Sequence, residues 1–391
     1  MAAASDKARY FLEQCVPELK EFERKNVFSP DEISSIVRKR SDLEHKINAR
    51  GSTPTDYARY AEFEINLDAL RRKRAKRLGI KSTTHNGKRR IFFVFDRGTR
   101  KHPGDVGLWM QAIEFARKQK AYKKLQEMFT NVLRLHPTKS DLWIYAAQFA
   151  MEENGDMTEA RSYMRRGLRF CKGSRAMWLE YARLEMTYIA KIHARRQILG
   201  ITNSKPDQGE KADEDENLMR LPNLTATDIS PDLAGNGVDR SALQNLESTS
   251  AMSSAIPMAI FDAAMVQFRD PTFGFDFFNM VLEYDELSAC RQILKHVEAK
   301  LMEDNPQSWC SQACHIQLPL VSLAPSSPAF PPAFRQALVH LKEARVKTND
   351  PEILSWARSW LRRLVQNPDS DPGIQKVGQS VLRSLDSPSS A

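Results

Sequence analysis

The sequence has no apolar stretch long enough to span a bilayer, so it predicts no transmembrane helix. Its first residues contain Asp6, Lys7 and Arg9 and lead into no uninterrupted apolar run, which is unlike a secretory signal peptide. The five cysteines are scattered and odd in number, which favours free thiols and a reducing compartment: Cys15, Cys171, Cys290, Cys310, Cys314. We therefore expect a soluble, intracellular protein.

The sequence also lacks the motifs of common enzyme classes. Gly104 and Gly107 lead into a tryptophan-containing helix without the Lys-Ser/Thr of a phosphate loop, and no strand pattern precedes them. A Gly-x-Ser-x-Gly nucleophile motif is absent. The closest carboxylate pairs are expected to lie on solvated helix faces: Glu62/Glu64, Glu152/Glu153. No catalytic residue, and no small-molecule substrate, is predicted.

One cluster has metal-ligand character, namely Cys310, Cys314 and His315. A structural zinc site needs four ligands, usually in two pairs, and the nearest other histidines, His296 and His340, are not spaced as a second pair. No metal ion or other cofactor is therefore predicted.

One sequence unit occurs three times between Asp105 and Glu185. Trp109, Trp143 and Trp178 begin the three copies and are separated by 34 and then 35 residues. Small or apolar residues follow each tryptophan at helical spacing: Ala112 and Phe115, Ala146 and Phe149, Tyr181 and Leu184. We expect these side chains to pack between neighbouring helices rather than to stack on a ligand.

Second amphipathic runs alternate with the tryptophan helices, so the repeated unit is a helix, a turn and a helix. The second runs cover residues 90–102, 122–135 and 158–171, and the predicted N-caps of the tryptophan helices are Asp105, Asp141 and Ser174. An earlier copy has Tyr57, Tyr60 and Phe63 at these positions. A period of this length predicts an all-α fold, an α-solenoid, because one helix pair cannot bury its apolar face alone.

The formal net charge is +9, and basic residues gather between residues 71 and 90. This segment has no acid: Arg71, Arg72, Lys73, Arg74, Lys76, Arg77, Lys81, Lys88, Arg89, Arg90. It is typical of a phosphate-backbone contact or a bipartite nuclear import signal, and equally of a solvated helix extension. No aromatic residue interrupts it, so base stacking is not indicated.

The N-terminal residues predict two amphipathic helices. The first covers residues 5–25, where Pro17 is expected to favour a kink; its apolar residues Phe11, Leu19 and Phe22 are candidates for contact with a partner. Ser29 is expected to cap the second helix, which continues to Ile47.

The residues after the tryptophan repeats differ in character. Residues 200–254 contain an acidic run within residues 211–216 and few large apolar residues, as in a disordered linker. Helices resume after residue 255, but residues 308–332 are apolar and rich in proline. An ordered loop, a linker and a retained intron remain open for this stretch. The expected domains are residues 1–55, 56–199, 200–254 and 255–391.

The repeat resembles the half-a-TPR (HAT) repeat. The resemblance is carried by Trp178-x-x-Tyr181-x-x-Leu184-Glu185 and by Ala160-Arg161 followed by Arg166-Gly167-Leu168, while the Gly-x-x-Tyr of tetratricopeptide repeats is absent. The order of features over residues 1 to about 200 further resembles the U-three small nucleolar RNA-associated protein 6 family.

The family resemblance implies a non-enzymatic scaffold in the nucleus and nucleolus. It implies membership of the B subcomplex of the small-subunit processome, contact with β-propeller proteins, and a direct or indirect association with U-three snoRNA and pre-rRNA. Two alternatives stay open. A HAT protein of splicing or mRNA end processing would have more repeats, and a direct RNA-binding module would use the basic segment.

Overall fold

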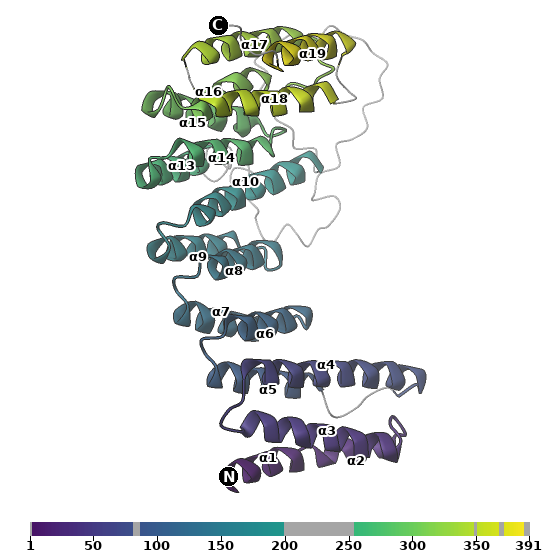
Figure 1. Ribbon diagram of the computed structural model, residues 1–391. Coiled ribbons are helices and arrows are strands. Elements are labelled where there is room, and N and C mark those ends of the chain that lie inside the picture. Colours follow the sequence, from purple (N-terminus) through teal and green to yellow (C-terminus); the bar gives the residue numbers. More distant parts are fainter. Residues whose placement is uncertain (1, 81–86, 199–253, 348–349, 367–370, 387–391) are drawn as a thin grey trace, which may run out of the picture. The chain divides into compact units, whose positions relative to one another are not determined.

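The computed structural model in Figure 1 describes residues 2–80, 87–198, 254–347, 350–366 and 371–386, and these residues contain helices and no strand. The predicted all-α fold of the α-solenoid class is confirmed. The chain divides into an N-terminal unit, residues 1–142, and a C-terminal unit, residues 143–391. The predicted linker lies outside the described residues except for Ser254, and the predicted domain boundaries stay predictions. None of the described helices combines the length and apolar character needed to cross a membrane.

The N-terminal unit consists of helices that pack on their neighbours. Helix α1 packs on α3, α4 on α5, and α6 on α7. The helices are α1 (Ala2–Glu13), α2 (Val16–Arg24), α3 (Pro30–Asn48), α4 (Pro54–Arg77), α5 (Gly87–Lys101), α6 (Val106–Lys118), α7 (Tyr122–Leu135) and the first turn of α8 (Ser140–Glu152).

Local sequence signals set most of these helix boundaries. Ser29 is the N-cap of α3, as predicted, and forms a capping box with Glu32. Asp105 accepts the backbone N–H of Leu108 at 2.6 Å at the start of α6. The predicted helix over residues 5–25 is wrong in one respect, because the chain breaks at Cys15 and restarts as α2. Pro17 lies in the first turn of α2, where a missing N–H donor leaves no backbone bond unmade.

The ten repeat residues lie in or at the edge of the helical core. Eight of the ten are buried and two, Phe63 and Trp178, are half-buried; the buried ones are Tyr57, Tyr60, Trp109, Phe115, Trp143, Phe149, Tyr181 and Leu184. The indole N–H groups of Trp109 and Trp178 each donate to a backbone carbonyl six residues earlier, at 3.1 Å. The first residue of the unit thus binds the turn before its helix as well as filling the core.

The C-terminal unit contains helices from both sides of residues 199–253. Helix α10 packs on α13 and α14, and Arg175 pairs with Asp270 across this contact. The elements after α8 are α9 (Met157–Phe170), α10 (Arg175–Ile198), α13 (Ala255–Phe268), α14 (Pro271–Leu282), α15 (Ser288–Asp304), α16 (Trp309–Gln317), the short 3₁₀ helix η2 (Leu318–Leu320), α17 (Phe330–Lys347), α18 (Pro351–Gln366) and α19 (Pro372–Asp386).

Residues 308–332 are ordered, and they include a helix that the sequence pattern did not predict. Cys310, Cys314 and Ile316 of α16 are fully buried, and the Ser311 hydroxyl donates to the Leu301 carbonyl at 3.2 Å. Helix α16 packs on α14, α15, α17 and α18. This stretch is therefore part of the C-terminal core.

Candidate interaction site

Several side chains of the basic segment, residues 71–90, form ion pairs within the chain. Arg71 donates to Oδ1 of Asp68 at 2.7 and 3.1 Å, and Arg72 contacts Oδ2 of the same carboxylate at 2.6 Å. Both Asp68 and Arg71 are buried. The two ion pairs therefore stabilise α4. Because Arg71 is also buried, it is unavailable to a phosphate.

Arg74 joins α4 to the start of α3. Its guanidinium donates to both oxygens of Glu32 at 2.6 and 2.7 Å and lies 4.9 Å from the ring centre of Phe28. The hydrogen bond from Arg74 is the main reason that the pKa of Glu32 falls to about 2. A bidentate pair of this kind fixes orientation as well as charge.

Five of the predicted basic residues are exposed, and besides the paired Arg72 they are Lys73, Lys76, Arg77 and Arg89. The described part of the chain supplies no ion pair for these last four. Lys88 is half-buried, and Lys81 lies outside the described residues. The surface left for an acidic partner is thus smaller than the sequence predicts.

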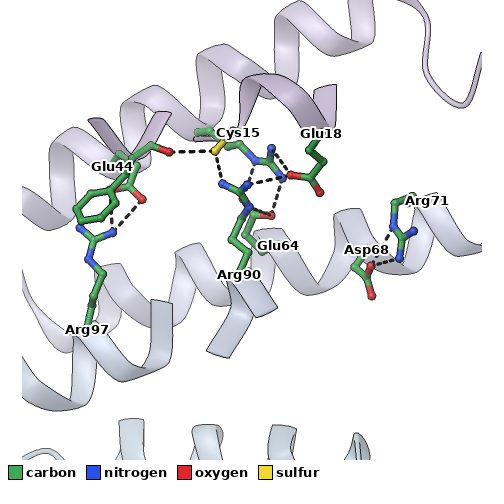
Figure 2. A network of polar contacts seen from close by, with 10 residues as sticks. Cys15, Glu18, Glu44, Glu64, Asp68, Arg71, Arg90 and Arg97 are labelled. Carbon is green, nitrogen blue, oxygen red and sulfur yellow. Dashed lines mark hydrogen bonds and ion pairs between the residues drawn. The ribbon is translucent and has the colours of Figure 1, made fainter. Parts of the chain in front are cut away.

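Arg90 belongs to a buried cluster, drawn in Figure 2, where it lies beside Cys15, Glu18 and Glu64. It donates to Glu18 at 2.9 Å and contacts the Cys15 sulfur. The pKa of the Cys15 thiol is raised by burial, with Arg90 acting against this shift. Arg90 is thereby committed to the interior of the N-terminal unit.

Arg40 is the centre of the same cluster and is 1% exposed. Its guanidinium donates to both oxygens of Glu64 at 2.7 and 2.8 Å, and to Glu18 at 3.4 Å. Burial alone would lower the pKa of Arg40, but the two carboxylates raise it above its ordinary value. Two arginines and two glutamates thus balance in charge where α2, α3, α4 and α5 meet.

The three predicted partner contacts have other roles in the structure. Leu19 and Phe22 are buried, 8% and 1% exposed, in a core cluster with Val27 and Phe28. Phe11 packs on Phe93, and the guanidinium of Arg97 lies over the Phe11 ring, 4.3 Å from its centre. This expectation is corrected: the apolar face of the N-terminal helices packs inward on the rest of the N-terminal unit.

The Arg40–Glu64 pair has a counterpart in the C-terminal unit. Arg161 of α9 donates to both oxygens of Glu185 of α10 at 2.7 Å, and both pairs join residues 24 positions apart. Glu64 and Glu185 each follow the first aromatic residue of their repeat by seven positions, where the two central repeats have Ala116 and Ala150. In the last copy, the two motifs that resemble the HAT repeat, one containing Arg161 and the other ending at Glu185, therefore bind each other.

Sequence reasoning missed this pair by assigning Glu64 to a solvated face. The carboxylate is 3% exposed, and it is buried because Arg40 compensates its charge. The constant separation of arginine and glutamate in the first and last copies was the available signal. Hydrophobic periodicity alone carries no information on such pairs.

Among the described residues, the Cys310, Cys314 and His315 cluster is not completed as a metal site. His315 bonds Glu298 at 2.8 Å and stacks on His340 with ring centres 4.0 Å apart. Burial raises the pKa of Cys310 to about 12, which keeps the thiol protonated. Across the described residues, no group of three or more His, Cys, Asp or Glu side chains is arranged to hold a metal ion.

The charged cluster coincides with the part of the chain that matches a known family. Residues 12–94 match the family model described as U3 small nucleolar RNA-associated protein 6. This range contains Cys15, Glu18, Arg40, Glu64 and Arg90.

Curated proteins with the same description match about half of the chain. A protein of Schizosaccharomyces pombe named U3 small nucleolar RNA-associated protein 6 is 38% identical over 208 residues, 52% of this chain and 43% of its own length. The human homolog is 34% identical over 190 residues, 48% of this chain and 32% of its own length. A Dictyostelium discoideum homolog is 28% identical over 187 residues, 47% of this chain and 31% of its own length. The chain thus covers less than half the length of these relatives.

The resemblance inferred from the residues is therefore confirmed: this chain is similar to the U3 small nucleolar RNA-associated protein 6 family, over residues 12–94 by the family model and over about half of its length by named relatives.

Proposed function

We propose that the chain is a non-enzymatic scaffold subunit of the small-subunit processome, associated with the U3 small nucleolar RNA and needed for early processing toward 18S rRNA. The observation that carries the proposal is the family match over residues 12–94, together with the names of the relatives. The same range is stabilised by buried ion pairs between four helices, which suits a rigid platform for other proteins. β-Propeller proteins of the B subcomplex are the proposed partners, and the nucleolus is the proposed location.

The test is affinity purification of the tagged full chain from nuclear extract in low and then high salt. We expect processome proteins and the U3 RNA to remain bound in high salt, because protein contacts with apolar cores are weakly screened. Recovery of splicing or mRNA end-processing factors instead would contradict the proposal. The variant Phe277→Ala, which disturbs the C-terminal core, serves as a control for loss of fold.

A second candidate function, direct RNA binding, is favoured by the four exposed basic residues near the end of α4 and the start of α5. The combined variant Lys73→Ala, Lys76→Ala, Arg77→Ala and Arg89→Ala should lower RNA affinity and flatten its dependence on salt, by a slope of roughly 0.7 per lost phosphate contact. Arg71, Arg74 and Arg90 are left unchanged because they hold the fold. The matched control replaces the exposed Arg165, Arg166, Arg169 and Lys172 by alanine. Equal RNA affinity in both variants would exclude this function for the segment.

A further inference from the structure

A groove of about 290 Å³ opens between α3 and α4 of the N-terminal unit. Its apolar lining comes from Phe28 and Ile36 on one side and from Phe63, Leu67 and Leu70 on the other. Phe28, Ile36 and Leu67 also belong to the N-terminal core cluster, so the floor of the groove is fixed by packing behind it. The groove is therefore a preformed site with an apolar floor and with Glu32, Ser35, Lys39 and Asn66 as its polar lining.

The rim of the groove combines an exposed apolar side chain with basic ones. Leu70 is 42% exposed, and Lys39 lies 5.9 Å from the ring centre of Phe63. Lys73 and Arg77 follow Leu70 at three and seven residues, so they extend the same face of α4. Along this face the surface changes from apolar to basic.

The charges at the groove favour an acidic occupant. Glu32, the acid in the lining, is neutralised by the bidentate contact from Arg74. Lys73 and Arg77 are exposed and have no ion pair within the described ranges. An approaching carboxylate would thus meet basic groups whose charge is not already compensated.

We propose that this α3–α4 groove is a docking site for a short segment of a partner protein in which large apolar residues are followed by acidic ones. The inference rests on the proposed scaffold function, to which it adds the chemistry of one partner. The volume accommodates a small number of large side chains, as when a helix places anchors at positions i and i+3 or i+4 into a groove. The acidic residues then lie over Lys73 and Arg77.

The geometry favours a protein segment over RNA. Single-stranded RNA binds through aromatic side chains that are free to stack on bases, but the one half-buried ring of this lining, Phe63, is covered by Lys39. The other apolar lining residues are the buried Phe28 and the aliphatic Ile36, Leu67 and Leu70, and the polar ones are Glu32, Ser35, Lys39 and Asn66. These features suit leucine, isoleucine or phenylalanine side chains.

The test is selection of a library of random 16-residue peptides displayed on phage against the full chain. We expect enriched peptides that combine large apolar residues with a run of Asp or Glu, and we would measure their affinity by fluorescence anisotropy.

Leu70→Glu should lower that affinity by about tenfold or more, as expected for an anchor contact. The combined variant Lys73→Glu and Arg77→Glu should lower it by less, and wild-type binding should weaken with salt. Val339→Glu, at a residue 47% exposed on α17, is the matched control and should bind like wild type. Circular dichroism confirms that each variant keeps its helices.

Several outcomes would overturn the inference. They are the absence of enrichment, enriched peptides without acids, and binding that survives Leu70→Glu. An RNA oligonucleotide that binds through Lys73 and Arg77 irrespective of Leu70 would assign the surface to nucleic acid. Concentration-dependent dimers abolished by Leu70→Glu would assign the groove to a second copy of the chain. If no peptide binds but processome proteins still co-purify, the docking site is wrong and the proposed function stands. If peptides bind through the groove but no processome protein co-purifies, the docking site stands and the proposed function is wrong.

Discussion

The same arginine–glutamate pair occurs in both units of the chain, and its surroundings differ. In the N-terminal unit Arg40 is 1% exposed and has a second carboxylate, Glu18, within reach. In the C-terminal unit the Arg161 side chain is 23% exposed. Glu185 is the only fully buried charged residue among the described residues of the C-terminal unit, whereas the N-terminal unit also buries Glu44, Asp68 and Arg71.

The difference indicates that apolar packing fixes the positions of the helices in the C-terminal unit, whereas buried ion pairs also fix them in the N-terminal unit. The C-terminal core consists largely of aromatic, aliphatic and cysteine side chains, including Phe261, Phe273 and Phe277. Such a core tolerates conservative changes of shape at modest cost. Buried charges are directional, and loss of one partner leaves the other uncompensated in a medium of low polarity. The N-terminal unit should therefore be the more sensitive to single changes of charge.

The largest effect is expected for Arg40→Met. Removing this guanidinium leaves Glu64 and Glu18 buried with Arg90 as their remaining partner, so the free energy of unfolding should fall by about 3–5 kcal/mol. Hydrogen exchange of α3–α5 peptides, read by mass spectrometry, measures this loss within the N-terminal unit. As a control, Arg40→Met combined with Glu64→Leu should recover much of the loss. A loss below about 1 kcal/mol would contradict the importance of the buried cluster.

The equivalent change in the C-terminal unit, Arg161→Met, should cost less, about 1–3 kcal/mol. The partner Glu185 remains buried, but Arg161 is partly solvated, so water can enter as the replacement donor. Hydrogen exchange of α9 and α10 peptides gives the comparison. If Arg161→Met costs as much as Arg40→Met, the difference in surroundings does not control the energy of the pair.

A glycine at equivalent helix positions gives a third comparison. The carbonyls of Gly98 and Gly167 each accept the N–H of the residue that ends the helix, His102 and Cys171. A Cβ atom at Gly167 would lie 2.8 Å from Cγ of Trp143 and closer still to the end of the Met177 side chain. At Gly98 the nearest atoms, from Leu108 and Tyr57, are at 2.9 and 3.0 Å.

Gly167→Ala should therefore destabilise the C-terminal unit by about 1–3 kcal/mol, although the same change in an unobstructed helix stabilises by about 1 kcal/mol. Gly98→Ala should cost less, because a Cβ atom there would lie 2.9 Å or more from its nearest neighbours, so each contact is longer than the corresponding one at Gly167. Thermal unfolding of both variants, followed by circular dichroism, gives the order. An increase in the melting temperature of Gly167→Ala would show that Trp143 and Met177 move aside for the added methyl group at little cost.

Sequence reasoning succeeded where the information is local. The tryptophan spacing, the caps at Ser29 and Asp105, and the repeat packing are set by periodicity and by side chains within a few residues of a helix end. The burial of Leu19 and Phe22, and the pairing of Arg40 with Glu64, depend on which helices meet in space. Helix α16 was missed because it is short and lies next to a proline-rich segment, and tertiary packing stabilises it.

The smallest effect concerns pH and the start of α4. Asp56 accepts hydrogen bonds from the backbone N–H and the hydroxyl of Thr53, both at 2.9 Å, and pairs with Lys46 at 3.1 Å. The backbone hydrogen bond from Thr53 is the main cause of a pKa lowered to about 2, against roughly 3.9 in an unfolded chain. Because the folded pKa is depressed, the stabilisation is fully present above about pH 4 and is lost as the pH falls through 2.

Asp56→Ala should therefore lower the free energy of unfolding by about 1 kcal/mol at pH 7. The gap between variant and wild type should close between about pH 4 and pH 2. Urea denaturation at pH 7, 4 and 2.5 measures this, and Glu62→Ala, an exposed change on the same helix, should leave the midpoint unchanged at each pH. A gap that stays constant down to pH 2.5 would mean that Asp56 acts through its shape and packing and that its charge contributes nothing to the stability of α4.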